Sequence, residues 1–331
     1  MEGDGMIIAM VSGKGGVGKT SIVANLGLAL ARAGKKTLLV DMDFFTRGLT
    51  FFLSKGTTSF RASVREGLNP KTRSFKFFRV EENLSVVPPV RRSLDTIKSN
   101  EILGLMGDDL AGLKSLFRQL SRLYSYVLVD CRSGADLLSI APALVADSYW
   151  IVTEEDRTSQ RTSAVLRESI DRFGLEHKAR ARFGGFIMNM TVSTRVDDLV
   201  DFFERTVFGE KCISVIPLDK NVRRAFIRDE LAIDRFPQTP FSREMQAIGA
   251  WLMKESVPSA TERASRRARI RLRRELLVPM AASLALAVSA GTAAMTVMGG
   301  LARSPLLGFV LGTMAGFIPM FYYYMFARRE W

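Results

Sequence analysis

The stretch at residues 11–21, VSGKGGVGKTS, decides the fold of this chain. Within it, residues 13–20 fit G-x-x-x-x-G-K-[ST], the pattern of a phosphate-binding loop. The glycines let successive backbone N–H groups curl around phosphate oxygens, and the N-terminal end of the next helix adds positive partial charge. An apolar run at 6–12 precedes the loop and an amphipathic segment at 20–33 follows it. This strand–loop–helix context predicts a nucleotide-binding domain.

The same motif predicts individual roles within the loop. Lys19 is expected to reach the β- and γ-phosphates of the nucleotide, and the Thr20 hydroxyl to ligate Mg²⁺. Lys14 is a second lysine that this mechanism does not require. The residues expected to contact nucleotide are Gly13, Gly15, Gly16, Val17, Gly18, Lys19, Thr20 and Ser21.

Beyond the loop, β-rich apolar runs alternate with helix-like stretches. The runs lie at 36–41, 84–88, 126–130, 148–153, 183–188 and 212–216, and the helix-like stretches at 108–123, 158–173 and 196–207. Buried parallel strands read as continuous apolar runs, because helices cover both faces of the sheet. The pattern therefore predicts an α/β fold with a doubly wound, mainly parallel sheet.

The extra lysine identifies a narrower class. KGGVGKT, at residues 14–20, resembles the deviant Walker A motif of the MinD/ParA ATPases. The resemblance implies that Lys14 reaches across a homodimer interface to the phosphates of the ATP bound by the partner. A cation delivered in this way offsets transition-state charge only when two subunits meet. An exposed loop lysine without function is the alternative reading of Lys14.

Four further positions match this family in order along the chain. Asp41 and Asp43 end the second predicted strand, and resemble the family's switch I aspartates. By that resemblance Asp43 orients the attacking water and Asp41 supports the Mg²⁺ shell. Asp130, at the end of YVLVD, resembles the Walker B aspartate that holds Mg²⁺ through water. Gly134 occupies the position of the switch II glycine, whose backbone N–H turns toward the γ-phosphate.

Similarity to the family covers residues 6 to about 253. Asn189 ends a strand whose final Asn reads the adenine edge in this family, although it equally suits a strand-end turn. SVIPLDKNVRRA, at 214–225, resembles the segment whose backbone cradles the base after Pro217. Arg132 departs from the family pattern, because switch II normally carries a small, often Pro-containing run there. Its role is left open between phosphate and partner.

Composition excludes several other classes of site. Cys131 and Cys212 form no CxxC, which argues against a disulfide framework, a Cys-bound metal and an iron–sulfur carrier. His177 is the only histidine, so His-based metal or triad chemistry is disfavoured. The formal charge is +13, of which ten Arg and three Glu place +7 after residue 260. The remaining +6 makes nucleic-acid binding possible, through residues such as Arg223 and Arg224, but not favoured.

The C-terminal part predicts a membrane anchor. Residues 276–302 and 304–327 contain no charged side chain, and each exceeds the roughly 20 residues that span a bilayer. The seven arginines at 262–276 suit an anionic membrane surface. Positive flanks place the ATPase domain and both termini in the cytoplasm of a multi-pass protein of the plasma (inner) membrane.

The predicted organisation has four parts. Residues 1–255 form the ATPase domain, and 256–276 a linker with a basic juxtamembrane helix. Residues 277–327 form a transmembrane hairpin with spans at about 277–300 and 305–327, and 328–331 a cytoplasmic tail.

These features predict a membrane-anchored ATPase with ATP and Mg²⁺ as its ligands. It is expected to form an ATP-dependent homodimer, to hydrolyse ATP slowly without a partner protein, and to control the positioning or assembly of a membrane-associated complex. Two alternatives remain. One is an ATP-locked scaffold with negligible turnover. The other is a bacterial tyrosine kinase of the same P-loop fold, suggested by the tyrosines at 322–324.

Overall fold

The computed structural model describes residues 5–69, 77–92, 95–179, 182–193, 196–209 and 212–253. All of them belong to the first of the two units into which the chain divides, Met1–Val257. The predicted basic helix, both predicted spans and the predicted tail lie outside the described residues. Among the described helices, none combines the length and apolar character needed to cross a membrane.

The described strands form one eight-stranded sheet in the order β3-β4-β2-β5-β1-β6-β7-β8. Every neighbouring pair is parallel except β3 and β4, which run antiparallel at the edge. This arrangement confirms the predicted mainly parallel α/β fold. The strands are β1 Met6–Val11, β2 Thr37–Asp41, β3 Phe78–Glu81, β4 Leu84–Val87, β5 Tyr126–Asp130, β6 Ser148–Thr153, β7 Phe183–Thr191 and β8 Cys212–Pro217.

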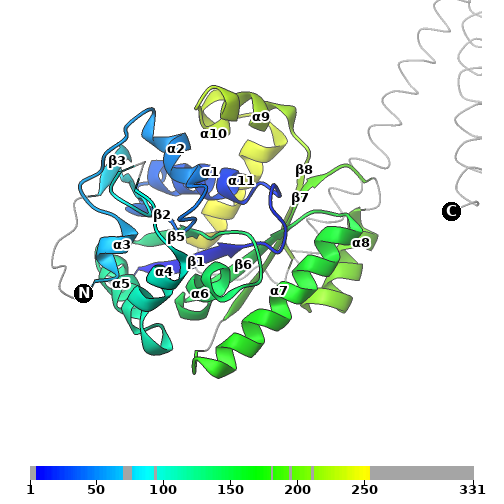
Figure 1. Cartoon of the computed structure of the whole chain (residues 1–331). Coiled ribbons are helices and arrows are strands. Elements are labelled where there is room, and N and C mark those ends of the chain that lie inside the picture. The colour runs from blue at the N-terminus through cyan, green and yellow to red at the C-terminus, as the bar shows by residue number, and fades with distance from the viewer. Residues whose placement is uncertain are drawn as a thin grey trace, which may run out of the picture. The chain divides into compact units, whose positions relative to one another are not determined.

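Helices connect the strands and cover both faces of the sheet (Figure 1). They are α1 Lys19–Arg32, α2 Gly48–Ser54, α3 Val64–Gly67, α4 Ser99–Met106, α5 Ala111–Ser121, α6 Leu137–Val145, α7 Arg157–Glu176, α8 Val196–Phe203, α9 Lys220–Ile227, α10 Ala232–Arg235 and α11 Pro240–Met253. A 3₁₀ turn at Asp108–Leu110 precedes α5, and a π-helical turn at Glu204–Phe208 follows α8.

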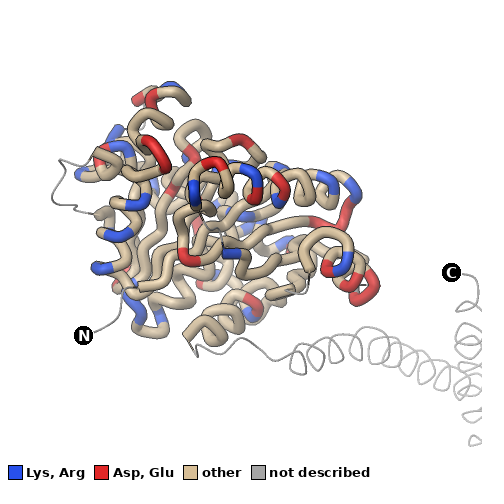
Figure 2. Tube along the Cα trace, turned by 90° about the horizontal axis from the view of Figure 1, so that it is seen from below, with Lys and Arg blue, Asp and Glu red and all other residues tan. Residues whose placement is uncertain are grey.

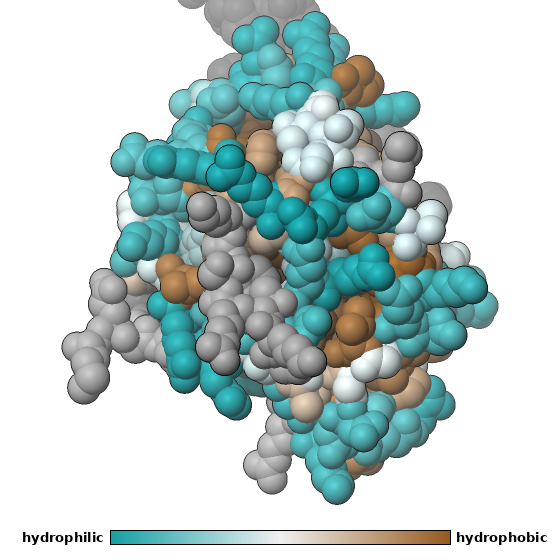
Figure 3. Space-filling model, turned by 60° about the vertical axis from the view of Figure 1, so that its left-hand side comes forward, coloured by the Kyte–Doolittle hydropathy of each residue, from teal (hydrophilic) through white to brown (hydrophobic). Residues whose placement is uncertain are grey.

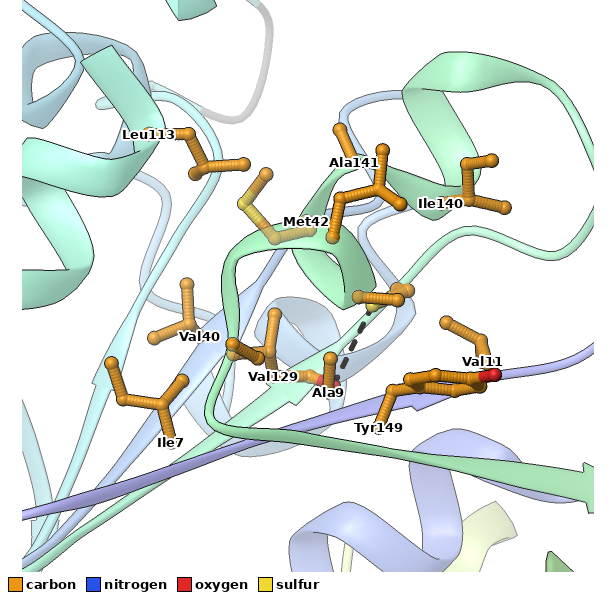
Figure 4. Close-up of a cluster of buried hydrophobic side chains, with 14 of the residues drawn as sticks. Ile7, Ala9, Val11, Val40, Met42, Leu113, Val129, Ile140, Ala141 and Tyr149 are labelled. Carbon is orange, nitrogen blue, oxygen red and sulfur yellow. Dashed lines mark hydrogen bonds between the residues drawn. The ribbon is translucent and has the colours of Figure 1, made fainter. Parts of the chain in front are cut away.

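Alternate residues of the central strand β1 feed two separate cores. Ile7, Ala9 and Val11 pack on the face covered by α5 and α6 (Figure 4). Ile8 and Met10 pack on the opposite face, which α1 and α11 cover. Since successive side chains of a strand point to opposite faces, a strand covered on both sides must be apolar throughout. This is why β1 reads as an unbroken apolar run.

The register of the central strands sets the position of the site. In the parallel pairing of β2 with β5, Asp41 lies beside Asp130, and Met10 of β1 lies beside Asp130 on the other side. The carboxyl ends of three neighbouring strands therefore meet at one edge of the sheet. In open α/β sheets, ligands bind at this edge, in the crevice beyond the strand ends.

The structure corrects the predicted helix at 108–123. Asp109 and Leu110 both have left-handed backbone conformations, with φ of 49° and 59°, so a continuous helix cannot start at 108. The helix α5 begins at Ala111 instead. Gly112 faces the end of α4 so closely that a Cβ there would lie 2.5 Å from the Leu105 carbonyl oxygen. The sequence pattern also missed the edge strand β3, which is short and exposes alternate residues.

The surface of the described domain mixes charges of both signs. Acidic and basic residues are interspersed along the trace in Figure 2. The face seen in Figure 3 is mainly hydrophilic, with separate hydrophobic side chains between the polar ones. This agrees with the mild basicity of the sequence before residue 261.

The packing of α1 against α11 predicts a large stability effect at Leu26. This side chain is fully buried, and its Cδ1 faces Gly249 of α11. Leu26→Ala removes buried methyl groups and leaves a cavity, so it should lower the free energy of unfolding by about 2–5 kcal/mol in urea titrations. Leu175, which is 85% exposed, is the matched control. Equal effects of Leu26→Ala and Leu175→Ala would contradict the described packing.

Candidate functional site

The loop between β1 and α1 has the shape of an open phosphate cradle. Gly16 and Gly18 have a φ of 84°, a left-handed conformation that glycine adopts without strain. A Cβ added at Gly15 or Gly16 would meet no atom within 4 Å, so the loop is open there. Helix α1 begins directly after the loop, at Lys19, and presents its N-terminal N–H groups.

Close contacts require glycine at two positions of the loop, Gly13 and Gly18. A Cβ at Gly13 would lie 2.3 Å from the backbone oxygen of Thr162 in α7. A Cβ at Gly18 would lie 2.3 Å from Nδ2 of Asn189 in β7. The loop is thus fixed from one side by α7 and from the other by β7, which holds its backbone in place for a ligand.

Lys19, Thr20 and Asp130 form a polar cluster below the loop. The Thr20 hydroxyl donates to Asp130 Oδ2 at 2.7 Å, and Lys19 Nζ donates to Asp130 Oδ1 at 3.1 Å. Lys19 is 8% exposed. Burial acts to lower its pKa, but the negative charge of Asp130 raises it above the ordinary value. Lys19 is therefore a buried, positively charged group at neutral pH, directly after the loop.

The donor set of this cluster fits Mg²⁺ and a nucleotide. A hydroxyl and a carboxylate are hard oxygen ligands of the kind Mg²⁺ binds, and Mg²⁺ usually keeps several waters beside one or two such ligands. Thr20 and Asp130 supply them within 2.7 Å of each other, next to the open glycine loop. The predicted roles of Lys19, Thr20 and Asp130 are consistent with this placement.

Asp41 ends β2, as predicted, and lies beside Asp130 of β5. Its carboxylate is fully buried and anchors the segment that follows β2. Oδ2 accepts from the backbone N–H and hydroxyl of Thr50 in α2, and Oδ1 accepts from the N–H of Asp43. Burial and the nearby charge of Asp130 raise the pKa of Asp41 to about 7. The contacts with Thr50 hold α2 against the sheet, and the Mg²⁺-shell role of Asp41 stays a prediction.

The Asp43 carboxylate is engaged by its own loop. Oδ1 accepts from the backbone N–H groups of Phe45 and Thr46, at 3.1 and 3.0 Å, and the Thr46 hydroxyl donates to Oδ2. Arg47, the residue directly before α2, lies next in the chain. These contacts hold the carboxylate in its turn, and the role of Asp43 in orienting a water molecule stays a prediction.

The loop after β5 is tied to the loop after β1. Gly134 has a φ of 133° and donates its N–H to the Ser12 carbonyl at 2.9 Å. The hydroxyls of Ser12 and Ser133 also lie 3.0 Å apart. The predicted turn of the Gly134 N–H toward a γ-phosphate would require release from Ser12.

Lys14 is held by two carboxylates of its own chain. Its Nζ lies 2.7 Å from Glu154 Oε2 and 3.1 Å from Asp156 Oδ2, and its side chain is 35% exposed. The hydrogen bonds that Lys14 donates to Glu154 and then to Asp156 raise its pKa. Burial works to raise the pKa of Asp156, but hydrogen bonds from Ser159 and Lys14 hold it well below the ordinary range.

Asn189 lies directly against the phosphate loop. It is buried, and its Nδ2 donates to the Val17 carbonyl at 2.8 Å. Pro217 ends β8 and pairs with Thr191 of the neighbouring strand, β7. Asp219, two residues on, caps α9 through the N–H of Asn221. The segment expected to cradle the base is thus beside the Asn189 strand, and the adenine-edge role of Asn189 stays a prediction.

Sequence reasoning missed several residues that contact the predicted site. Glu154 and Asp156 hold Lys14, Thr50 holds Asp41, and Phe45 donates to Asp43. The acidic run at 154–156 directly follows a predicted strand, which was a usable signal because parallel strand ends share one edge. Thr50 and Phe45 gave no such signal.

Known proteins resemble this chain in sequence along most of the described domain. The family model "CobQ/CobB/MinD/ParA nucleotide binding domain" matches residues 8–232. An uncharacterized ATP-binding protein of Methanocaldococcus jannaschii is 27% identical over 247 residues, which cover 74% of this chain and 87% of the relative. The septum site-determining protein MinD of Synechocystis sp. is 29% identical over 226 residues, covering 65% and 77%.

Solved structures show the same fold. MinD from Pyrococcus horikoshii, complexed with Mg-ADP, superposes with a TM-score of 0.60 at 22% identity, over 75% of this chain and 95% of that one. MinD from Aquifex aeolicus in the MinC:MinD complex gives 0.58 at 23% identity, over 76% and 98%. With the family model matching more than half of its length, the chain belongs to the CobQ/CobB/MinD/ParA nucleotide-binding family.

Proposed function

We propose that this chain is a membrane-anchored ATPase that dimerises with ATP and hydrolyses it to control the positioning or assembly of a membrane-associated partner complex. The observation that carries the proposal is Lys14, a second lysine in the phosphate loop that pairs with Glu154 and takes no part in the Lys19–Thr20–Asp130 cluster.

ATP binding is supported by the cluster and the cradle together. Lys19 supplies a permanent positive charge for the β- and γ-phosphates, and Gly15 and Gly16 leave their backbone open to them. Mg²⁺ held through Thr20 and Asp130 would neutralise charge that develops on the phosphates. Because little covalent chemistry is asked of the protein in phosphoryl transfer, positioned charges of this kind supply most of the catalysis.

Slow turnover follows from contacts that two of the proposed catalytic residues already make. Asp43 is engaged by Phe45 and Thr46, and Lys14 by Glu154 and Asp156. Lys14 has to leave these carboxylates before it reaches a facing subunit, and the contacts of Asp43 restrain its carboxylate. Exposed ion pairs are worth only about 0–1 kcal/mol, so phosphate on a facing subunit is able to compete for Lys14.

Attachment to the membrane by two spans would make the switch act in place. A pair of spanning helices is effectively irreversible, unlike a single amphipathic helix. ATP would then control dimerisation or partner binding and not membrane residence. MinD of Aquifex aeolicus, which this fold resembles, forms a complex with MinC. By analogy, we propose a protein partner that stimulates hydrolysis.

Subunit mixing tests whether Lys14 acts across the dimer. Lys14→Ala and Asp43→Asn should each reduce ATP turnover on the order of 100-fold, since each removes a group that stabilises the transition state. In a 1:1 mixture, half of the dimers are mixed and each has one complete site, so turnover should recover to about one quarter of wild type.

The matched control for this experiment is Lys35→Ala, which alters an exposed lysine outside the site. Absence of recovery in the mixture would show that Lys14 acts within its own subunit. Negligible turnover by the wild-type dimer, with ATP binding intact, would favour the ATP-locked scaffold.

The Lys14 ion pairs also predict a pH-dependent stability term. Asp156→Asn keeps a good cap for α7, because Asn caps helices about as well as Asp, but it loses the charge pair. Since the pKa of Asp156 is lowered by folding, its contribution is present above the unfolded value of about 3.9 and fades as pH falls below it.

Urea midpoints of wild type and Asp156→Asn should therefore differ at pH 7 and converge only as the pH falls below about 4, toward the depressed pKa of the folded state. In a Lys14→Met background the difference at pH 7 should shrink, because the cation is gone. A difference that is independent of pH and of Lys14 would contradict the ion pairing.

Membrane attachment has a direct fractionation test. The full-length chain should stay in the membrane pellet after alkaline carbonate extraction, because two apolar segments of 27 and 24 residues exceed the roughly 20 needed for a span. A chain ending after residue 255 should be released to the supernatant. Release of the full-length chain by carbonate would refute the hairpin.

A further inference from the structure

Arg132, at the start of the loop after β5, contacts the loop after β2. Its guanidinium lies over the ring of Phe45, 5.0 Å from the ring centroid. Its Nη1 also lies 3.5 Å from Oδ2 of Asp136, which caps α6. The planar guanidinium of arginine stacks on aromatic faces in a way that a lysine ammonium does not. Arg132 thus joins two loops that are far apart in sequence.

Phe45 is connected in turn to the carboxylate proposed to orient water. Its backbone N–H donates to Asp43 Oδ1 at 3.1 Å, beside the N–H of Thr46 at 3.0 Å. The Phe45 ring is 46% exposed, so core packing does little to fix it. Its contact with Arg132 therefore contributes to holding the Asp43 turn in the described conformation.

On the other side, Arg132 lies two residues before Gly134. The Gly134 N–H donates to the Ser12 carbonyl at the start of the phosphate loop. The bond from Arg132 to Asp136 spans Gly134, and the Asp136 carboxylate is further fixed by the N–H and hydroxyl of Ser139. Gly134 lies between Arg132 and Asp136 in the chain. A shift of its backbone would therefore move these two residues relative to each other and disturb the ion pair between them.

We propose that Arg132 is a positioning residue that couples the two loops, so that release of Asp43 from its turn and release of Gly134 from Ser12 favour each other. Its consequence for hydrolysis rests on the proposed function, whereas the coupling itself does not. Coupling between two sites is reciprocal, so each loop must report a change made in the other by the same factor.

The size of the coupling follows from the contact. A cation–π contact at an exposed site shifts an equilibrium by about two- to five-fold. The Arg132–Asp136 pair is half-exposed on both sides, and adds little of its own. The coupling is therefore a bias on the opening of the two loops, which nucleotide or a partner can overcome.

Amide hydrogen exchange on the full-length chain tests the coupling without hydrolysis. Arg132→Gln should speed exchange of the Thr46 amide about two- to five-fold, although Arg132 is in the other loop. Phe45→Leu should speed exchange of the Gly134 amide by the same factor. Phe45→Trp keeps an aromatic face and should leave both amides as in wild type.

Two controls separate coupling from a general loss of stability. Arg65→Gln breaks an exposed ion pair with Glu101 at 2.6 Å and should change neither amide. The amide of Leu128, in the central strand β5, should exchange equally in all variants. The double variant Arg132→Gln/Phe45→Leu should exceed neither single one, because both remove the same contact.

The coupling is wrong if each variant affects only its own loop, or if the two effects add in the double variant. Basal ATP turnover supplies a second measurement. Both single variants should raise it by the same factor, about two- to five-fold, because the contact restrains Asp43. A fall with Arg132→Gln alone would overturn the restraining role. Absence of turnover in every protein would contradict the proposed function but leave the exchange result standing.

Discussion

The parallel register of three strands is the constraint on which the rest of the site depends. Because β2, β5 and β1 end together, Asp41, Asp130 and the phosphate loop share one edge of the sheet. Asp130 then binds both Lys19 and Thr20, the two side chains at the start of α1. A shift of one residue in this register would turn Asp130 to the other face and separate all three.

The other groups with proposed roles in hydrolysis lie in loops around this centre, where ion pairs and hydrogen bonds hold them. Lys14 is bound to Glu154 and Asp156, Asp43 to its own turn, and the Gly134 N–H to Ser12. Lys14 and Asp43 are partly exposed, whereas Asp41 is fully buried. The domain thus combines a rigid strand edge with groups that have alternative partners, which is what a nucleotide-dependent switch requires.

Much of the fold was predictable from sequence, because buried parallel strands are continuous apolar runs and the glycine loop fixes what comes before and after it. Lys19, Thr20 and Asp130 were predictable for the same reason. The partners of Lys14 were not, since Glu154 lies 140 residues away and only the sheet order brings it near. The contact of Asp41 with Thr50 was not predictable either, because Thr50 lies in a helix with no clear sequence signal. The break before α5 was missed because Asp109 and Leu110 take left-handed backbone conformations there. Residues other than glycine rarely adopt this conformation, so the residue pattern did not indicate it.

The central claim is that Lys14 leaves its own chain's carboxylates to complete the site of a second subunit. A structure of the full-length protein with ATP and Mg²⁺ measures this directly. The account predicts that Lys14 Nζ lies about 3 Å from a phosphate oxygen of the ATP bound by the facing subunit, away from Glu154 and Asp156. A dimer, or a monomer, with ATP bound and Lys14 still paired to Glu154 and Asp156 would contradict it.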